Sequence, residues 1–207
     1  MKTNTLSGRS GTVLWLVVFI SVFIWSAIHP HDYMTWLLEV TPAILGLAVL
    51  SFTRNKFPLT QMTYVLILVH SVVLMIGGHY TYAEVPMFEQ LGAVFGSERN
   101  NYDKLGHFFQ GFVPAIVARE ILVRLRVVNG RVWMNFIIVC ICLAISAVYE
   151  LIEWGVAVIS STAAESFLGT QGYVWDTQSD IAWAMSGAII ALAVLGRPHD
   201  RQLSTLR

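Results

Sequence analysis

The sequence predicts an all-α membrane protein: a bundle of about six transmembrane helices, with both termini cytoplasmic and a polar cluster at the periplasmic end. Hydrophobic residues make up 56% of the 207-residue chain and charged residues only 13%, whereas a soluble domain carries about 25% charged residues. The apolar residues fall in tracts that match the roughly 20 residues of a spanning helix. We therefore expect a single integral membrane domain over residues 1–207.

Five tracts are apolar over nearly their whole length. They cover residues 11–28, 34–53, 59–78, 133–159 and 177–196. The first follows Lys2 and Arg9 and so resembles a signal peptide, but its 18 residues exceed the roughly 7–15 residues of a signal-peptide core. We expect it to remain as the first span. In the last tract, Gly187 and Ala184 predict a close helix contact, because small residues let two helix backbones approach.

A sixth tract, residues 105–123, is less apolar because it contains His107, Gln110 and an adjacent Arg–Glu pair. Without this span, residues 79–132 would form a connection of 54 residues with an apolar centre, so we count it. An even number of spans places both termini on the same side of the membrane.

The basic residues indicate which side that is. With the N-terminus in the cytoplasm, ten basic residues lie in the inner tails and connections: Lys2, Arg9, Arg54, Lys56, Arg124, Arg126, Arg131, Arg197, Arg201 and Arg207. Only Arg99 and Lys104 then lie outside. Because cytoplasmic loops carry an excess of Lys and Arg, this distribution favours cytoplasmic termini.

Acidic residues gather on the periplasmic side of this topology. Those outside, or in the outer half of a span, are Asp32, Glu39, Glu84, Glu89, Glu98, Asp103, Glu150, Glu153, Glu165, Asp176 and Asp180. Acidic residues contribute little to orientation, so this bias is a separate feature of the chain. The formal net charge is zero, which disfavours nucleic acid as a partner and leaves membrane lipids.

Two of the polar groups lie at the outer ends of spans. Asp103, His107 and Gln110 follow one another at i, i+4 and i+7 and would share one helix face. Glu150 and Glu153 share a face near the outer edge of the fifth span. Carboxylates at membrane depth are costly and normally face a partner or a water-filled cavity.

Two further groups flank the spans. Asp176, Gln178 and Asp180 begin the sixth span, and the third span is followed by His79, Tyr82 and Glu84. Each group has a structural alternative: Asp103 and Asp176 suit helix N-termini, and buried carboxylates also serve in hydrogen-bond networks. The connection over residues 160–176 is unusually apolar, and we expect it to cover a site formed by these groups.

Carboxylates and imidazole together form the ligand set of Zn, Mn, Fe or Mg sites, so a divalent metal is a candidate cofactor. The candidate metal ligands are Asp103, His107, Glu150, Glu153, Asp176 and Asp180. Among them, His107, Glu150 and Asp103 are the candidate catalytic groups, and the expected cavity residues are His79, Tyr82, Glu84, Gln110 and Gln178. The sequence has no H-E-x-x-H, G-x-S-x-G, P-loop or G-x-G-x-x-G motif, so the site is a spatial inference.

Four stretches carry a resemblance to a known family. They are GGHYTYAEVP, RNNYDKLGHFFQGFVPA, SAVYELIEW and FLGTQGYVWDTQSDIAWAMSGA. They resemble the YjdF-type family of bacterial inner-membrane proteins, a domain family without assigned function, over about residues 10–200. This resemblance implies a multi-pass protein of the bacterial inner membrane.

A more distant similarity is to the VanZ-like proteins, small membrane proteins linked to glycopeptide resistance. Their pattern is D-K-x-x-H-F, then a Glu, then D-x-x-x-N-x-x-G. The matching residues are Asp103, Lys104, His107, Phe108, Glu150, Asp180 and Gly187, and Ala184 stands at the Asn position.

We consider three functions. The leading hypothesis is a membrane-embedded hydrolase or transferase that acts on a lipid or envelope precursor at the periplasmic face, with or without a metal. The alternatives are a small-solute or proton-coupled transporter and a structural or accessory subunit. Intramembrane acids often mark ion paths, but the inner halves of most spans contain almost no ionisable residue. That distribution disfavours a carrier.

Overall fold

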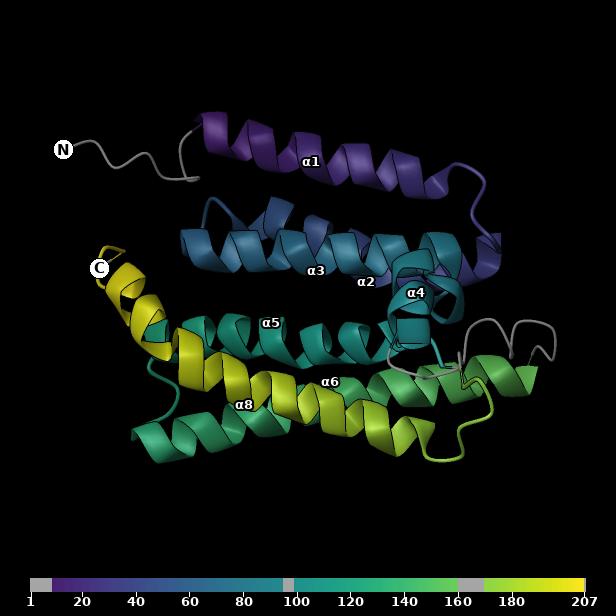
Figure 1. Cartoon of the computed structure of the whole chain (residues 1–207). Helices are drawn as coiled ribbons and strands as arrows, with labels where there is room; N and C mark the ends of the chain where they lie inside the picture. Colours follow the sequence, from purple (N-terminus) through teal and green to yellow (C-terminus); the bar gives the residue numbers. More distant parts are fainter. Residues whose placement is uncertain (1–8, 95–98, 160–169, 207) are drawn as a thin grey trace.

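A computed structural model describes residues 9–94, 99–159 and 170–206, and all regular structure within these ranges is helical (Figure 1). The helices in chain order are α1 (Arg9–Ala27), α2 (Tyr33–Thr53), α3 (Gln61–Tyr80), the 3-10 helix η1 (Tyr82–Glu84), α4 (Pro86–Val94), α5 (Tyr102–Arg124), α6 (Arg131–Ile159) and α8 (Asp176–Leu203). The all-α class that the composition predicts is confirmed.

The long helices form two groups that meet along α3 and α5 (Figure 1). In the first group, α1 and α2 pack against α3 around buried residues such as Phe19 and Met75. In the second, α6 and α8 pack against α5 and against each other around Ile116 and Ile138. The two cores are separate, and α5 is the element that borders both groups.

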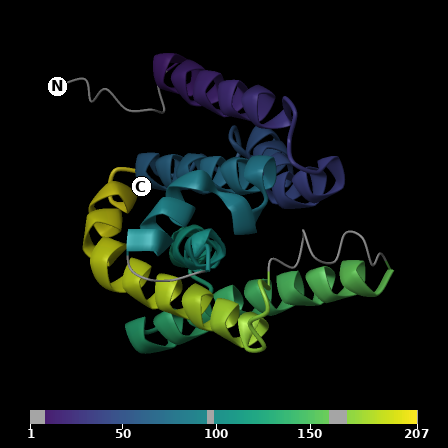
Figure 2. The same cartoon turned by 45° about the vertical axis from the view of Figure 1, so that its right-hand side comes forward.

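Five helices, α1, α2, α3, α6 and α8, are long and apolar enough to cross a membrane. The least apolar expected span forms α5, which has 23 residues and lies between α3 on one side and α6 and α8 on the other (Figure 2). Its polar residues Asp103, His107 and Glu120 are buried. A helix this polar can run beside apolar ones because its polar face meets protein instead of lipid.

The bundle has two distinct ends (Figure 1). At one, here called the polar end, α3 and α6 end and α5 and α8 begin, and at the opposite one, the anchor end, α1 begins and α8 ends. The first residues of α1 and the last residues of α8 therefore lie at the same end of the bundle. Which end faces the periplasm remains a prediction from the distribution of basic residues.

The contact between α5 and α8 is backbone to backbone. A Cβ atom on Gly187 would lie 2.1 Å from the carbonyl oxygen of Phe108, and one on Gly111 would lie 1.7 Å from the carbonyl oxygen of Ala184. Neither position has room for a side chain. The close contact expected at Gly187 is therefore present, and it brings the N-termini of α5 and α8 together at the polar end.

A saturated polar cluster joins the helices at the anchor end. Glu120 is fully buried, and its carboxylate accepts hydrogen bonds from the backbone N–H and the hydroxyl of Thr60, both at 2.8 Å, and from the hydroxyl of Thr63 at 2.7 Å. His199 Nε2 and Arg124 each lie 3.1 Å from it. This cluster joins α3, α5 and α8, and its hydrogen bonds are suited to holding the three helices together.

Candidate functional site

The first turns of α5 position the centre of the polar end. The helix begins after Asn101, and Asn100, not Asp103, accepts a hydrogen bond from the backbone N–H of Tyr102, at 3.1 Å. Asp103 instead pairs with His107, one turn further along, with 3.3 Å between Oδ1 and Nε2. The capping alternative for Asp103 is therefore not realised. The predicted alignment of an acid and an imidazole on one helix face is present.

The outer part of α6 brings two more carboxylates to the same imidazole. Glu150 Oε1 lies 3.6 Å from His107 Nε2. One donor atom from each of His107, Glu150 and Glu153 lies within 4.8 Å of the others, and all three side chains are buried. The i, i+3 spacing of the two glutamates places both on the face of α6 that packs against α5.

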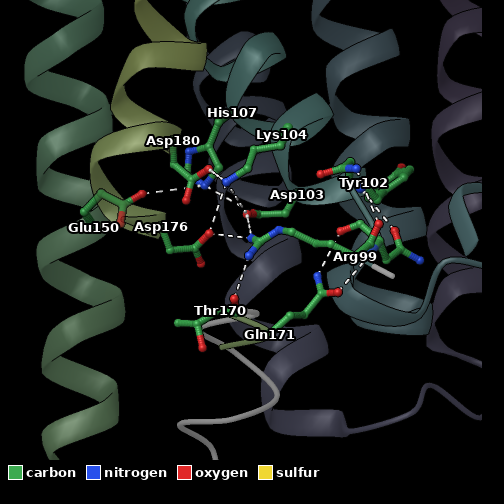
Figure 3. Close-up of polar contacts among 12 residues, drawn as sticks. Arg99, Tyr102, Asp103, Lys104, His107, Glu150, Thr170, Gln171, Asp176 and Asp180 are labelled. Atoms are coloured by element: carbon green, nitrogen blue, oxygen red, sulfur yellow. Dashed lines mark hydrogen bonds and ion pairs between the residues drawn. The ribbon is translucent and has the colours of Figure 1, made fainter. Parts of the chain in front are cut away.

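The N-terminal turn of α8 supplies a second group of acids (Figure 3). Lys104 Nζ lies 2.8 Å from Asp180 Oδ1 and 3.1 Å from Asp176 Oδ1. Arg99 also pairs with Asp176, and lies 3.6 Å from Asp103. Helix α8 begins at Asp176, and no side chain caps its N-terminus. The Asp176 carboxylate pairs with the cations of the cluster instead of capping the helix. Two cations thus link the α5 acids to the α8 acids.

The chain before α8 covers part of this cluster. Arg99 donates to the carbonyl oxygen of Thr170 at 2.6 Å, and Gln171 exchanges two hydrogen bonds of 2.9 Å with the backbone of Asn100. The ring of Tyr173 lies 5.2 Å from the Arg99 guanidinium, a cation–π distance. Residues 170–175 therefore cover the site as expected, whereas residues 160–169 of the predicted cover lie outside the described residues.

A small polar chamber lies on the other side of His107. Its volume is about 20 Å³, enough for one water molecule or one ion. Its walls are Glu39, Leu74, Tyr82, Asp103, Gly106, His107, Gln110, Tyr149 and Glu153. Tyr149 donates to Glu39 Oε2 at 2.9 Å. Burial raises the pKa of Tyr82 well above its usual range, so its hydroxyl remains protonated.

The charges of the site do not balance. Six buried carboxylates meet there: Glu39, Asp103, Glu150, Glu153, Asp176 and Asp180. Among the described residues around them, the cationic groups are Arg99, Lys104 and, when protonated, His107. An excess of buried negative charge is unfavourable unless protons or a bound cation compensate for it. The arrangement is therefore suited to proton transfer or to cation binding.

Three buried oxygens beside His107 have no hydrogen-bond partner within the described ranges. They are Asp103 Oδ2, Glu150 Oε1 and the hydroxyl of Ser146, one turn before Glu150 on α6. Buried polar atoms are nearly always paired in folded proteins, and exceptions cluster at functional sites. Asp103 Oδ2 and Glu150 Oε1 have only ion-pair contacts of 3.6 Å or longer, so this donor set suits a cation or a polar substrate group.

Several predicted residues lie away from this cluster. His79 Nδ1 faces the backbone oxygen of Ser26 at 3.1 Å, Glu84 pairs with exposed His31 at 3.3 Å, and the side chain of Gln178 is exposed. Of the expected cavity residues, Tyr82 and Gln110 do line the chamber. The spacing after the third span did not reveal that His79 would face α1 and that Glu84 would face the connection between α1 and α2.

Other residues of the site were not among the predicted ones. Glu39 on α2 reaches the chamber from a different helix group, and its presence inside a span was the available signal. Arg99 and Lys104 serve as the bridging cations. Their signal was that they are the two basic residues on the periplasmic side of the predicted topology.

These features define a multi-pass integral membrane protein with a buried ionic cluster at one end of its helix bundle. The chain belongs to the family described as "Predicted membrane protein (DUF2238)", whose model matches residues 11–201. It is 52% identical over 182 residues to the "Inner membrane protein YjdF" of Escherichia coli (strain K12). The aligned region covers 88% of this chain and 87% of that protein. No solved structure matches the chain significantly.

The comparisons confirm the resemblance to the YjdF-type family and, with the five long apolar helices, the location in the inner membrane. The protein is a multi-pass protein of the bacterial inner membrane. Neither the family description nor the name of the relative states a reaction, a substrate or a cofactor.

Proposed function

We propose that the cluster around His107 is the active site of a membrane-embedded hydrolase or transferase that acts on a lipid or envelope precursor at the periplasmic face. The observation that carries this proposal is that the buried Oε1 of Glu150 on α6 has no hydrogen-bond partner among the described residues and faces the imidazole of His107 on α5 at 3.6 Å as an ion-pair partner. A buried carboxylate oxygen of this kind costs folding free energy and is typical of a group kept for chemistry.

Glu150 is the group best suited to act as general base. Both ring nitrogens of His107 already face an acceptor oxygen: Nε2 faces Asp103 at 3.3 Å and Nδ1 faces Gln110 Oε1 at 3.2 Å. Neither nitrogen is therefore available to accept a proton from a substrate. His107 Nε2 instead faces Glu150 Oε1 as an ion-pair partner at 3.6 Å, which is beyond hydrogen-bond range, so Oε1 would accept the proton of the attacking water or hydroxyl group.

Glu153 is suited to return that proton. It lies on the same face of α6, within 4.8 Å of the donor atoms of His107 and Glu150, and it lines the small chamber. Two carboxylates in different surroundings are the usual means by which one site provides both a base and an acid. In this scheme Glu150 enters as the carboxylate and takes a proton from water or the hydroxyl group, while Glu153 enters protonated and gives its own proton to the leaving group. The proton on Glu150 then passes to Glu153, which resets the site.

The same residues fit a divalent cation. Asp103, His107 and Asp180 offer one set of donor atoms within 4.8 Å of one another, and His107, Glu150 and Glu153 offer a second. One imidazole with carboxylates suits Zn or Mn, and the excess of buried negative charge favours a cation. A bound metal would polarise the scissile group and lower the pKa of a bound water.

The distribution of polar groups supports catalysis over transport. The second buried polar cluster, around Glu120 at the anchor end, is saturated by hydrogen bonds. Between the two clusters, α5, α6 and α8 pack around apolar residues such as Ile116 and Ile138. A proton-coupled carrier needs polar groups that connect the two faces of the membrane, and this apolar core separates the two polar clusters.

The test is the conversion of lipids by the purified protein in nanodiscs made from total inner-membrane lipid extract, followed by mass spectrometry, with and without added Zn²⁺ or Mn²⁺. We expect Glu150→Gln to lower the conversion at least ~100-fold, the usual range for loss of a general base. Glu89→Gln, an exposed position on α4, is the matched control and should retain activity.

Two results would contradict the proposal. One is an unchanged lipid profile with the wild-type protein under all metal conditions. The other is equal conversion by Glu150→Gln and the wild type. Metal content measured on the same samples adds a readout that is independent of activity: if a metal binds, His107→Asn should lower its occupancy while Glu89→Gln should not.

A further inference from the structure

A cavity at the anchor end lies between the start of α1, the end of α2 and the first turn of α3. Its volume is about 640 Å³, within the range of small-molecule pockets. Arg54 and Asn55 line its polar part, and Trp15, Leu16, Leu47 and Leu50 line its apolar part. We call it the anchor pocket. It is at the other end of the bundle from the ionic cluster and has no part in the chemistry proposed above.

The anchor pocket separates helices that are joined at the polar end. There, Trp36 Nε1 of α2 donates to the hydroxyl of Ser26 of α1 at 3.1 Å. At the anchor end, the guanidinium of Arg54 donates to the hydroxyl of Thr12, and both residues line the pocket. The link between α1 and α2 beside the pocket is thus a single charged side chain bound to a neutral group.

The charge of Arg54 is not compensated within the protein. Arg54 alone is charged among the described residues that line the pocket. The acids near the anchor end are engaged elsewhere: Glu120 pairs with Arg124 and His199, and Asp200 pairs with Arg119. A guanidinium presents a planar fork of N–H donors that matches the oxygens of a phosphate group. The polar part of the pocket is therefore complementary to an anion.

The apolar part of the pocket indicates that this anion belongs to a lipid. Along α2 the lining extends from Leu47 to Arg54, a rise of about 10 Å, whereas the hydrocarbon of one leaflet is about 15 Å thick. With Arg54 at the level of the head groups, the pocket reaches the upper part of the acyl chains. A free phosphate ion would fill only the polar part and would leave Trp15 and Leu47 without an apolar partner.

The lining also discriminates between lipid head groups. The ammonium of phosphatidylethanolamine would find no carboxylate among the described lining residues, because none of them is acidic. One guanidinium suits one phosphate. The amide of Asn55 offers further donors beside it. A head group with a single phosphate and no amine therefore fits best.

We propose that the anchor pocket binds one anionic phospholipid of the phosphatidylglycerol class. Its phosphate lies at Arg54 and Asn55, and the upper part of an acyl chain lies along Leu16, Leu47 and Leu50. This site does not rest on the proposed function. In the predicted topology it faces the cytoplasmic leaflet, whose anionic lipids attract basic groups at the membrane surface.

Arg54→Gln tests the phosphate contact, because the amide of glutamine can still donate to Thr12 but carries no charge. Lys56→Gln is the matched control. It makes the same change in charge two residues further along, at an exposed position that does not line the pocket. Glu150→Gln reports on any lipid held by the ionic cluster at the other end of the bundle.

The experiment is native mass spectrometry of the delipidated protein in detergent, titrated with phosphatidylglycerol or with phosphatidylethanolamine that carries the same acyl chains. We expect one phosphatidylglycerol to bind with a Kd at least ~10-fold lower than that of phosphatidylethanolamine. Arg54→Gln should raise the Kd of phosphatidylglycerol at least ~10-fold, the loss expected for a charge-assisted hydrogen bond. Lys56→Gln and Glu150→Gln should bind it as the wild type does. Melting temperatures without lipid check the folding of each variant.

Four results would overturn the proposal: equal affinity for the two lipids, unchanged binding by folded Arg54→Gln, an equal loss in Lys56→Gln, or a loss in Glu150→Gln. The third would indicate attraction to surface charge in general, and the fourth would place the lipid at the ionic cluster. A competition arm with inorganic phosphate keeps the test decisive even if Arg54→Gln does not fold. Displacement of the lipid from the wild type by millimolar phosphate would indicate a soluble ligand, whereas retention of the lipid supports the pocket.

Discussion

The contact between α5 and α8 allows a quantitative prediction for Gly187→Ala. The new Cβ would lie 2.1 Å from the carbonyl oxygen of Phe108, whereas carbon and oxygen approach to about 3.3 Å, so the helices must separate by about 1.2 Å. The clash is with backbone, which cannot turn aside as a side chain can. We therefore expect a cost at or above the upper end of the usual 1–3 kcal/mol for overpacking, about 3 kcal/mol.

A separation of this size also reaches the ionic cluster. The 2.8 Å contact between Lys104 and Asp180 would lengthen beyond hydrogen-bond range, because Asp180 lies on the same helix two turns before Gly187. Gly187→Ala should thus weaken both the fold and the site. At roughly 2–4 °C per kcal/mol for a chain of this size, the melting temperature should fall by about 6–12 °C.

The assay is thermal unfolding of the purified protein in detergent, followed by loss of helical circular dichroism. Gly196→Ala is the control on the same helix, since a Cβ at Gly196 has no atom within 4 Å and alanine is the better helix former by up to about 1 kcal/mol. A melting temperature of Gly187→Ala equal to or above that of Gly196→Ala would refute the claim that the helix backbones are in contact.

Three further predictions concern other parts of the molecule. Glu120→Gln should lower the free energy of unfolding by about 3–5 kcal/mol, as expected when one partner of a buried ionic network is removed. A loss below ~1 kcal/mol in urea titrations would contradict a stabilising role of the Glu120 cluster at the anchor end. The hydrogen bond from the backbone N–H of Thr35 holds the pKa of Asp32, the N-cap of α2, below its usual range. The stabilisation that the ionised Asp32 carboxylate gives to the fold is therefore present above the pKa that Asp32 has in the unfolded chain, about 3.9. It is lost as the pH falls through the pKa that Asp32 has in the folded protein. Asp32→Ala should cost about 0.5–2 kcal/mol at pH 7 and progressively less below pH ~4 in stability measurements. Reporter fusions should show both chain ends in the cytoplasm, and a periplasmic reporter at either end would reverse the proposed orientation.

Much of the fold was predictable because lipid imposes a simple rule on sequence. A helix that crosses a bilayer must be apolar over about 20 residues, and five of the expected tracts form helices that meet this requirement. The sixth was expected from the length of the connection that its absence would leave, and α5, the helix that it forms, is not among the five that meet this requirement. Small residues at Gly187 and Ala184 also predicted a close contact, because only they permit backbones to touch.

The candidate site was predictable only where periodicity operates within one helix. Asp103 and His107, or Glu150 and Glu153, share a face by their spacing alone. Spacing could not show that His79 would turn to Ser26 instead of the chamber. That choice depends on how α1 packs against α3, which is a matter of tertiary contacts.

The roles of the acidic residues in the first turns of α5 and α8 were less predictable still. Asp103 and Asp176 lie in the first turns of their helices, where local rules favour acidic residues, and in the folded protein they pair with His107 and with the two cations Arg99 and Lys104. Residues 160–169, predicted to cover the site, lie outside the described residues.

The amino-acid sequence alone specified a membrane-spanning helical chain and the helices that would carry acids and a histidine, because hydropathy and helix periodicity are local properties. The folded arrangement alone determined that His107 of α5 would meet Glu150 of α6, and that Glu39 of α2 would line the same chamber as His107. Such pairings depend on which helices are neighbours. That choice is made by packing, down to the contact of two glycines between α5 and α8.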